Sequence, residues 1–139
     1  MKPEGCSILF VNQEDQVLLF LRDDIPRIPY PNTWDLLGGH VEEGESPEEC
    51  IVREMQEELI KDGEGLDITG FQLFTVTEFP DRTEYTYWLR ANFDIGDVEL
   101  TEGQRLQWFT REETRNTELA FGFNSVVEEF FQKAPFAEA

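Results

Sequence analysis

Three glutamates, Glu54, Glu57 and Glu58, are the residues whose type and spacing predict chemistry in this chain. On a helix with about 100° per residue they fall within an arc of about 100°. Like charges at this spacing cost an isolated helix roughly 0.2–0.5 kcal/mol per pair, so we expect a compensating cation. Because carboxylate oxygens are hard ligands, the favoured cations are Mg²⁺, Mn²⁺ and Ca²⁺.

A helix start directly precedes these glutamates. Ser46 can cap the first turn, Pro47 suits the first helical position, and Glu49 can reach back in a capping box. Another side of this helix carries an apolar stripe, formed by Ile51, Val52, Met55 and Leu59. Upstream, Gly38-Gly39 allows the backbone to approach a ligand closely. The sequence therefore predicts a helix from about Pro47 that packs on one side and is anionic on another.

An acidic, solvent-exposed helix is the alternative interpretation, because 30 of the 139 residues are Asp or Glu. That alternative does not account for the two glycines before the helix or for Arg53 among the glutamates. A functional site is therefore the favoured interpretation.

The run from Gly39 through Glu45 to Arg53-Glu54-Met55-Gln56-Glu57-Glu58 resembles the Nudix box, the signature of hydrolases that cleave a nucleoside diphosphate linked to another group. Every charged position of the signature is present. The match fails near its end, where Ile60 replaces the usual glycine and Lys61 the final apolar residue. Because that glycine normally closes the helix in a left-handed cap, we expect the helix to run about one turn further, to Gly63 or Gly65.

The resemblance implies metal-dependent hydrolysis of a pyrophosphate bond in a nucleotide. One to three Mg²⁺ or Mn²⁺ ions would neutralise phosphate oxygens and acidify a water for in-line attack. The implied metal ligands are the Gly38 carbonyl and the side chains of Glu54, Glu57, Glu58 and the more distant Glu102. Arg53 would orient the carboxylates, with Glu45 supporting it and Gly39 at the turn. Either Glu54 or Glu102 would accept the proton. For Glu102, an ordinary exposed loop carboxylate is the alternative.

Strand-like and helical segments surround the box helix. Two hairpins are expected, from residues 6–11 with 17–21 and from residues 68–79 with 83–93. A short buried strand at 34–37 follows a proline-rich loop at 23–33, a short helix begins near Thr110, and residues 124–133 form an amphipathic helix. This order argues for an α/β fold with a mixed sheet between helices, which agrees with the Nudix-type α/β/α sandwich that the resemblance implies.

Substrate choice is predicted from residues outside the box. The resemblance to MutT-like members implies a nucleoside triphosphate, with an oxidised purine nucleotide such as 8-oxo-dGTP as one candidate, cleaved to monophosphate and pyrophosphate. Arg22 could contact phosphate or pair with Asp23 or Asp24, and Asn124 could read the base or cap its helix. The alternatives are ADP-ribose, another nucleoside diphosphate sugar, a dinucleoside polyphosphate, or a non-catalytic module that senses a nucleotide.

A net charge of −19 and a pI near 4.2 disfavour polynucleotides and anionic membranes as partners, so a small nucleotide arriving with metal is expected. We expect a single Nudix domain over residues 1–139, without a signal peptide or membrane span, located in the cytoplasm. Cys6 and Cys50 are expected to be core thiols. Many relatives form dimers, so a homodimer is one expected arrangement.

Overall fold

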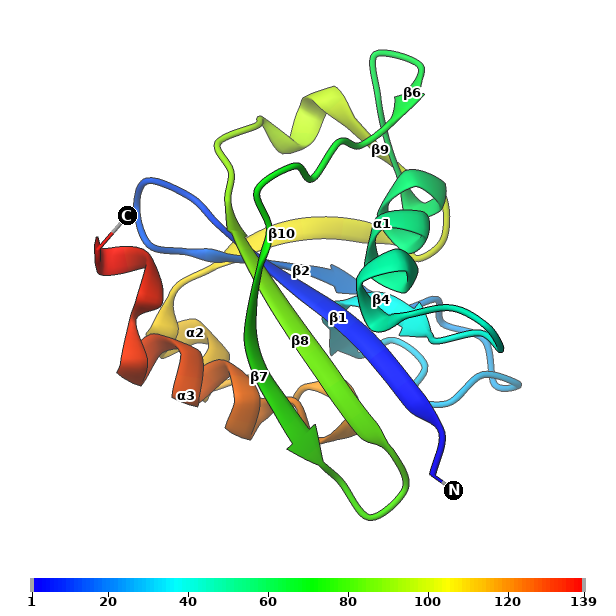
Figure 1. Ribbon diagram of the computed structural model, residues 1–139. Helices are drawn as coiled ribbons and strands as arrows, with labels where there is room; N and C mark the ends of the chain where they lie inside the picture. Colours follow the sequence, from blue (N-terminus) through cyan, green and yellow to red (C-terminus); the bar gives the residue numbers. More distant parts are fainter. Residues whose placement is uncertain (1, 139) are drawn as a thin grey trace.

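A mixed β-sheet forms the middle layer of the protein, whose computed structural model describes residues 2–138 (Figure 1). Its path is β10-β2-β1-β8-β7, with β3 paired to β2 and β4 paired to β1. The β1–β8 pair is parallel and the other pairs are antiparallel. The strands are β1 (Glu4–Val11), β2 (Val17–Leu21), β3 (Trp34–Asp35), β4 (Leu37–His40), β7 (Gln72–Glu78), β8 (Thr83–Arg90) and β10 (Arg105–Phe109).

Helices cover both faces of this sheet, because each face carries its own apolar core. Alternation along β1 directs Cys6, Ile8 and Phe10 toward α1 (Pro47–Glu58), and Leu9 and Val11 toward the other side. There α3 (Asn124–Lys133) buries Val126, Val127, Phe130 and Phe131, and α2 (Arg111–Arg115) packs beside it. Figure 1 shows α1 and the α2–α3 pair on opposite sides of the strands. The predicted α/β/α sandwich is confirmed.

The predicted hairpins and helix starts are also confirmed. β1 and β2 pair antiparallel, as do β7 and β8 on either side of residues 79–82. Ser46 and Thr110 each form a reciprocal capping box, at the starts of α1 and α2 respectively. The predicted strand at 34–37 is instead two short strands, β3 and β4, and Gly38-Gly39 lies inside the second.

The end of α1 differs from the sequence prediction. The helix stops at Glu58 and does not continue to Gly63 or Gly65, because Leu59 turns to an extended conformation. Residues from there enter a small second sheet made of β5 (Leu59–Lys61), β6 (Glu64–Gly65) and β9 (Val98–Leu100). Ile60, which replaces the box glycine, pairs with Glu99 and Gly65. Strand pairing therefore ends this helix without a glycine cap.

The cysteines were predicted as core thiols, and this was wrong about their bonding. Both side chains are buried, but a disulfide joins Cys6 of β1 to Cys50 of α1. Their Cα atoms lie 6.5 Å apart, within the range that a disulfide can bridge. The pairing could not be predicted from the sequence, because the two cysteines are 44 residues apart and only the packing of α1 on β1 brings the sulfurs together.

Three short 3₁₀ helices complete the chain, at Ile95–Asp97, Ala120–Gly122 and Pro135–Glu138. Among residues 2–138, every helix is too short or too polar to cross a membrane.

Candidate active site

The first turn of α1 fixes the direction in which the box helix leaves the Gly-Gly strand. The Glu49 backbone N–H donates to Ser46 Oγ over 3.1 Å, and the Ser46 N–H donates to Glu49 Oε1 over 2.9 Å. Burial of Cys50, Ile51 and Met55 then sets the rotation of the helix on the sheet. With the start and the rotation fixed, the position of each glutamate follows from the helical period.

Arg53 is the centre of the charged cluster. Its Nε and Nη2 donate to the two oxygens of Glu45 over 2.7 and 3.0 Å, a bidentate pair. Nη1 donates to Glu54 over 3.0 Å and to Glu57 over 3.4 Å. The hydrogen bond to Glu45 raises the pKa of Arg53 and lowers the pKa of Glu45. The predicted orienting role of Arg53, supported by Glu45, has the geometry it requires.

Glu58 is the box carboxylate whose surroundings most disfavour an uncompensated negative charge. Its Oε2 is buried and has no hydrogen-bond partner within residues 2–138. Burial, together with a hydrogen bond to Glu54 and the charges of Glu54, Glu102 and Asp35, raises the pKa of Glu58 to about 9. A buried carboxylate in such surroundings is stabilised either by a proton or by a cation.

Both glycines have close neighbours, the β1 backbone at Gly38 and the flexible Glu54 side chain at Gly39. A side-chain carbon at Gly39 would overlap the Glu54 carboxylate, and one at Gly38 would overlap the Cys6 carbonyl oxygen. Gly38 also has a φ of 154°. Gly39 therefore brings the β4 backbone against Glu54, whereas Gly38 lies against the β1 backbone.

The loop that carries Glu102 is attached to the end of α1. The Thr101 backbone N–H donates to the Glu58 carbonyl, and Thr101 Oγ1 donates to the Glu57 carbonyl, each over 3.0 Å. Glu102 itself is exposed, and its charge contributes to the raised pKa of Glu58. The structure therefore brings Glu102 near the box glutamates. Sequence reasoning missed Thr101, because its role depends on a contact across more than forty residues.

These carboxylates are near one another, yet within residues 2–138 no three acidic, His or Cys side chains converge closely enough to hold a metal ion. Glu57 is 60% exposed and turned toward Arg53. The donor set nevertheless fits a hard divalent cation, since it consists of oxygens and includes the unpartnered Glu58 Oε2.

Arg22 does not make the ion pair that the sequence offered as the alternative to a phosphate contact. It pairs with neither Asp23 nor Asp24: its Nη1 lies 3.0 Å from Asp35 Oδ2, and its Nε donates to the Pro29 carbonyl. Burial raises the pKa of Asp35 to about 6, although Arg22 opposes that shift. Asp35 was missed by sequence reasoning. Its signal was an acidic residue inside an apolar strand, Trp34 to Leu37.

Asn124 is engaged in the loop before its helix. Its Oδ1 accepts from the Leu119 N–H over 2.8 Å, and its Nδ2 donates to the carbonyls of Thr117 and Thr114 over 2.7 and 3.3 Å. The cap position of α3 belongs to Phe123, so Asn124 is not the predicted helix cap. Both Nδ2 donors are therefore engaged, while Oδ1 retains one lone pair for a further donor.

A further buried carboxylate, Glu84, lies across the sheet from the box helix. Glu84 pairs with Arg82 over 2.8 Å, and the guanidinium of Arg82 lies 4.1 Å from the ring centre of Phe79. Burial raises the pKa of Glu84. The ring of Phe79 is thus stacked on an arginine. Two other aromatic side chains are engaged in ring contacts, since Phe74 packs on Phe130 and Tyr87 on Phe71.

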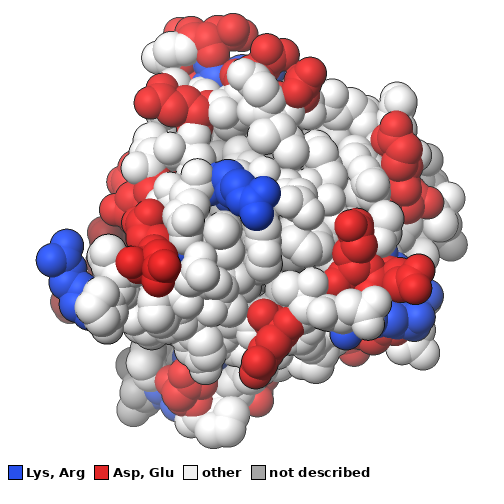
Figure 2. Space-filling model, turned by 180° about the vertical axis from the view of Figure 1, so that it is seen from behind, with Lys and Arg blue, Asp and Glu red and all other residues white. Residues whose placement is uncertain are grey.

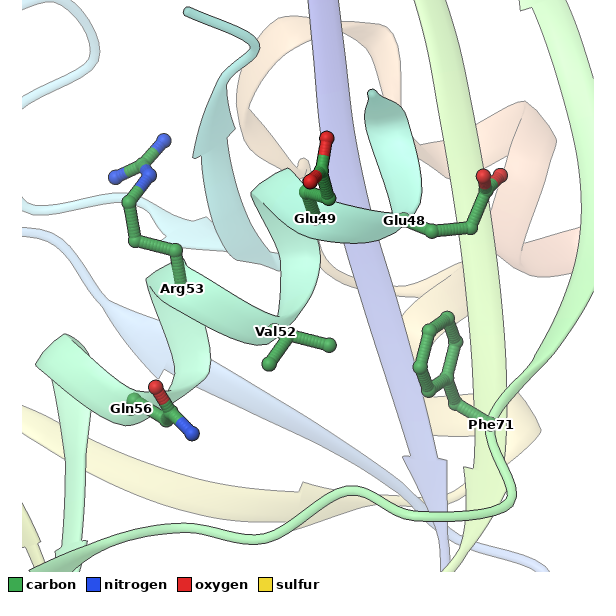
Figure 3. Close-up of a pocket in the computed structure, with 6 residues that line it drawn as sticks. All are labelled: Glu48, Glu49, Val52, Arg53, Gln56 and Phe71. Carbon is green, nitrogen blue, oxygen red and sulfur yellow. The ribbon is translucent and has the colours of Figure 1, made fainter. Parts of the chain in front are cut away.

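Two shallow hollows mark the surface near these elements. One, of about 290 Å³, is lined by Thr114, Arg115, Asn124 and Glu128. The other, of about 360 Å³, lies along α1 and is lined by Glu48, Glu49, Val52, Arg53, Gln56 and Phe71. In Figure 3 the Arg53 side chain extends away from Phe71 and Val52. Neither hollow is lined by the box glutamates Glu54, Glu57 and Glu58. The candidate site is therefore identified from its side chains and not from a pocket in the surface.

Charge over the surface agrees with the sequence. Figure 2 shows acidic side chains at many places on the face seen from behind, with no extended basic patch there. Such a face repels nucleic-acid backbones.

Comparisons with known proteins decide the family. The NUDIX domain profile matches residues 1–130.

The chain belongs to the Nudix family.

Among its relatives, the nucleoside triphosphatase NudI of Enterobacter sp. (strain 638) is 35% identical over 126 residues, covering 82% of this chain and 85% of that protein. A putative 8-oxo-dGTP diphosphatase of Bacillus subtilis (strain 168) is 43% identical over 58 residues, which cover 42% of this chain. The match spans only 35% of the Bacillus protein.

Solved structures agree with the family assignment. A structure from a study of MutT from Aliivibrio salmonicida and Vibrio cholerae has a TM-score of 0.74 and 25% identity, covering 96% of this chain and 99% of that one. Nudix hydrolases generally need a divalent metal, and the oxygen donors of the box helix fit that need.

Proposed function

We propose that this chain is a metal-dependent pyrophosphohydrolase that cleaves a nucleoside triphosphate to a monophosphate and pyrophosphate. The observation that carries the proposal is the buried, unpartnered Oε2 of Glu58. Glu58 is next to Glu54, and the nearby Arg53 is paired with Glu45. The names of the relatives support a nucleoside triphosphate, and an oxidised purine nucleotide such as 8-oxo-dGTP is the candidate that we favour.

Mg²⁺ or Mn²⁺ is the proposed cation. Its proposed ligands are the Gly38 carbonyl and the carboxylates of Glu54, Glu57, Glu58 and Glu102. When bound, the cation supplies neutralisation of the phosphate oxygens and a more acidic water.

The residues of the chain have separate roles in this proposal. Arg53 holds Glu54 in place through Nη1 while Glu45 fixes the other edge of the guanidinium. The attacking water must lose a proton, and Glu54 or Glu102 accepts it. Nε and Nη1 of Arg22 donate to Pro29 and Asp35. Its Nη2 is therefore the atom that contacts a phosphate in this proposal. Asn124 can accept a hydrogen bond from a base through Oδ1, but it donates to one only if its Nδ2 bonds exchange.

The test is release of pyrophosphate and phosphate across a nucleotide panel that includes 8-oxo-dGTP, the ordinary triphosphates, ADP-ribose and a dinucleoside polyphosphate. Each nucleotide is assayed with Mg²⁺, with Mn²⁺ and with chelator. We expect release from a triphosphate with metal and none with chelator. Preferred cleavage of ADP-ribose or a dinucleoside polyphosphate would replace the substrate while keeping the chemistry.

A module that only senses a nucleotide would bind members of the panel by calorimetry without cleaving any of them. The intact set of charged box residues favours the enzyme, because a sensor has no need of every ligand.

Substituting Glu102→Gln and Glu54→Gln separately distinguishes the two candidate bases. Because both residues are also proposed metal ligands, each variant should bind Mg²⁺ more weakly, and only the base variant should lack turnover at saturating Mg²⁺.

We further propose that residues 1–139 form one Nudix domain, which acts in the cytoplasm on a small nucleotide without polynucleotide or membrane partners. A homodimer is the proposed assembly, and sedimentation equilibrium measures it directly.

A further inference from the structure

The disulfide between Cys6 and Cys50 ties the box helix to the central strand, and Cys50 stands at one of the unspecified positions between Glu45 and Arg53. Cys6 is 2% exposed and Cys50 is fully buried. Cys50 lies in the first turns of α1, three residues before Arg53. The bond therefore anchors the segment of helix from which the charged cluster is built.

The sulfur of Cys50 lies against the Arg53 side chain. Cys50 Sγ is 3.4 Å from the His40 carbonyl oxygen and 3.8 Å from Arg53 Nη2. The same Nη2 donates to the His40 carbonyl over 3.2 Å and to Glu45 over 3.0 Å. One carbonyl oxygen thus faces both the sulfur and the guanidinium.

Reduction changes what this sulfur can do. A disulfide sulfur has no proton to donate, so in the oxidised protein Cys50 gives the His40 carbonyl no hydrogen bond, whereas Arg53 Nη2 donates to that oxygen. A Cys50 thiol is a donor and can compete with Arg53 for that oxygen. Reduction therefore weakens one of the contacts that hold Arg53 against Glu45 and Glu54.

We propose that Cys6–Cys50 is a thiol–disulfide switch that acts on the charged box through Arg53. In the reductive direction a glutathione thiolate attacks one sulfur and forms a mixed disulfide. A second glutathione thiolate then breaks that bond, giving oxidised glutathione and two protonated cysteines. Two electrons pass from two glutathione molecules to the protein, and oxidised glutathione reverses the reaction. Such disulfides in reducing compartments are usually transient and redox-sensing.

Access to the buried bond depends on the first turn of α1. Cys50 donates its backbone N–H to the Ser46 carbonyl, so opening of the capped turn exposes the sulfur. Losing an N-cap weakens a helix start by about 1 kcal/mol, which corresponds to a roughly fivefold rise in opening. Thr110 caps α2 with the same reciprocal box and contacts neither cysteine, which provides a matched control.

The first experiment follows reduction of the native protein by glutathione, with alkylation and mass spectrometry to count free thiols. Protein equilibrated with oxidised glutathione should yield a linked Cys6–Cys50 peptide. Ser46→Ala should be reduced roughly fivefold faster than wild type, and Thr110→Ala at the wild-type rate. Two alkylated cysteines in the protein treated with oxidised glutathione, or equal acceleration by both variants, would overturn the proposal.

The second experiment separates the thiol donor from the loss of the cross-link. Cys6→Ala keeps the Cys50 thiol, whereas Cys50→Ala removes it, and both lose the bond. This readout rests on the proposed function. With a cleaved nucleotide, reduced wild type and Cys6→Ala should have a kcat lower by roughly fivefold than oxidised wild type. Cys50→Ala should stay close to the oxidised value. Equal kcat in the two variants, or in the two redox states, contradicts the switch.

A readout independent of catalysis distinguishes failure of the switch from failure of the proposed function. The Arg53 Nε–H signal in a nitrogen-15 correlation spectrum should move between the oxidised and reduced wild-type protein. Cys6→Ala should give the reduced position and Cys50→Ala the oxidised one. If no nucleotide is cleaved but these shifts appear, the enzyme proposal fails and the switch stands. Coincident signals in all four samples overturn the switch.

Discussion

The two faces of the sheet differ in how many carboxylates share each arginine. On the α1 face one arginine, Arg53, serves several carboxylates, with Glu45, Glu54 and Glu57 within 3.4 Å. On the other face two arginines, Arg111 and Arg115, serve one carboxylate, Glu128, over 2.8 and 2.7 Å.

The pKa values of two glutamates follow this difference. Hydrogen bonds from Arg115 and Arg111 lower the pKa of Glu128 to about 2, whereas burial among other carboxylates raises the pKa of Glu58 to about 9. Because the chain holds 11 Lys and Arg against 30 Asp and Glu, arginines are scarce. Two of them are placed between α2 and α3, while the box retains an excess of negative charge. That excess is what a cation-binding site requires.

The largest expected effect tests how the α1 face is attached. Reducing the Cys6–Cys50 bond, which closes a span of 44 residues, should lower the free energy of unfolding by about 4 kcal/mol. Urea unfolding with and without reductant measures this difference. Matched scans of the Cys6→Ala/Cys50→Ala double variant should show no response to reductant. An equal midpoint for oxidised and reduced wild type would mean that both faces are held by packing alone.

The next effect compares glutamates from the two faces. Glu57→Gln should lower kcat by about 100-fold or more with the fold intact, because a proposed metal ligand is lost. Glu128→Gln, the matched change on the other face, should leave kcat unchanged. Steady-state kinetics with Mg²⁺ and circular dichroism supply the measurements. Wild-type rates in Glu57→Gln would refute the assignment of the box.

A pH series sharpens the comparison of Glu58 with Glu128. Since the folded-state pKa values of Asp35 and Glu58 are raised, to about 6 and about 9, the stability that they contribute is complete near pH 4. It is lost as the pH rises through these values. Glu128, whose pKa is lowered, is ionised in both folded and unfolded protein above pH 5 and adds no slope there.

Urea unfolding at pH 5, 7 and 9 measures the predicted loss of stability with rising pH. Mg²⁺ should make this loss smaller, because a cation favours ionised Glu58. Glu58→Gln should flatten the part of the curve between pH 7 and 9. A metal-free protein that is equally stable at pH 5 and pH 9 would contradict the charge excess.

The smallest effect compares the two capping boxes. Ser46→Ala and Thr110→Ala should each cost about 1 kcal/mol of stability. Only Ser46→Ala should also lower kcat, because α1 alone carries the box. The two variants need one thermal melt and one activity assay each, and a larger loss of activity in Thr110→Ala would argue against this separation of roles.

Sequence reasoning succeeded where the cause is local. Ser46, Pro47 and Glu49 specify a helix start within four residues, and the 3.6-residue period places Glu54, Glu57 and Glu58 on one side whatever surrounds them. Alternating and aromatic runs similarly predicted the two hairpins. The amphipathic pattern of residues 124–133 predicted the last helix. The strands β9 and β10 were not predicted, because their short patterns gain meaning only through pairing with β5 and β2.

The sequence by itself determined the family chemistry of this protein, since the box glutamates, the arginine and the glycines occupy a single run from Gly38 to Glu58. Only the tertiary structure decided that Cys6 reaches Cys50, that Arg22 pairs with Asp35, that Thr101 holds the Glu102 loop to α1, and that α1 ends at Glu58. The physical reason is that each of these outcomes depends on packing between segments distant in the chain or on strand pairing, which no local spacing encodes.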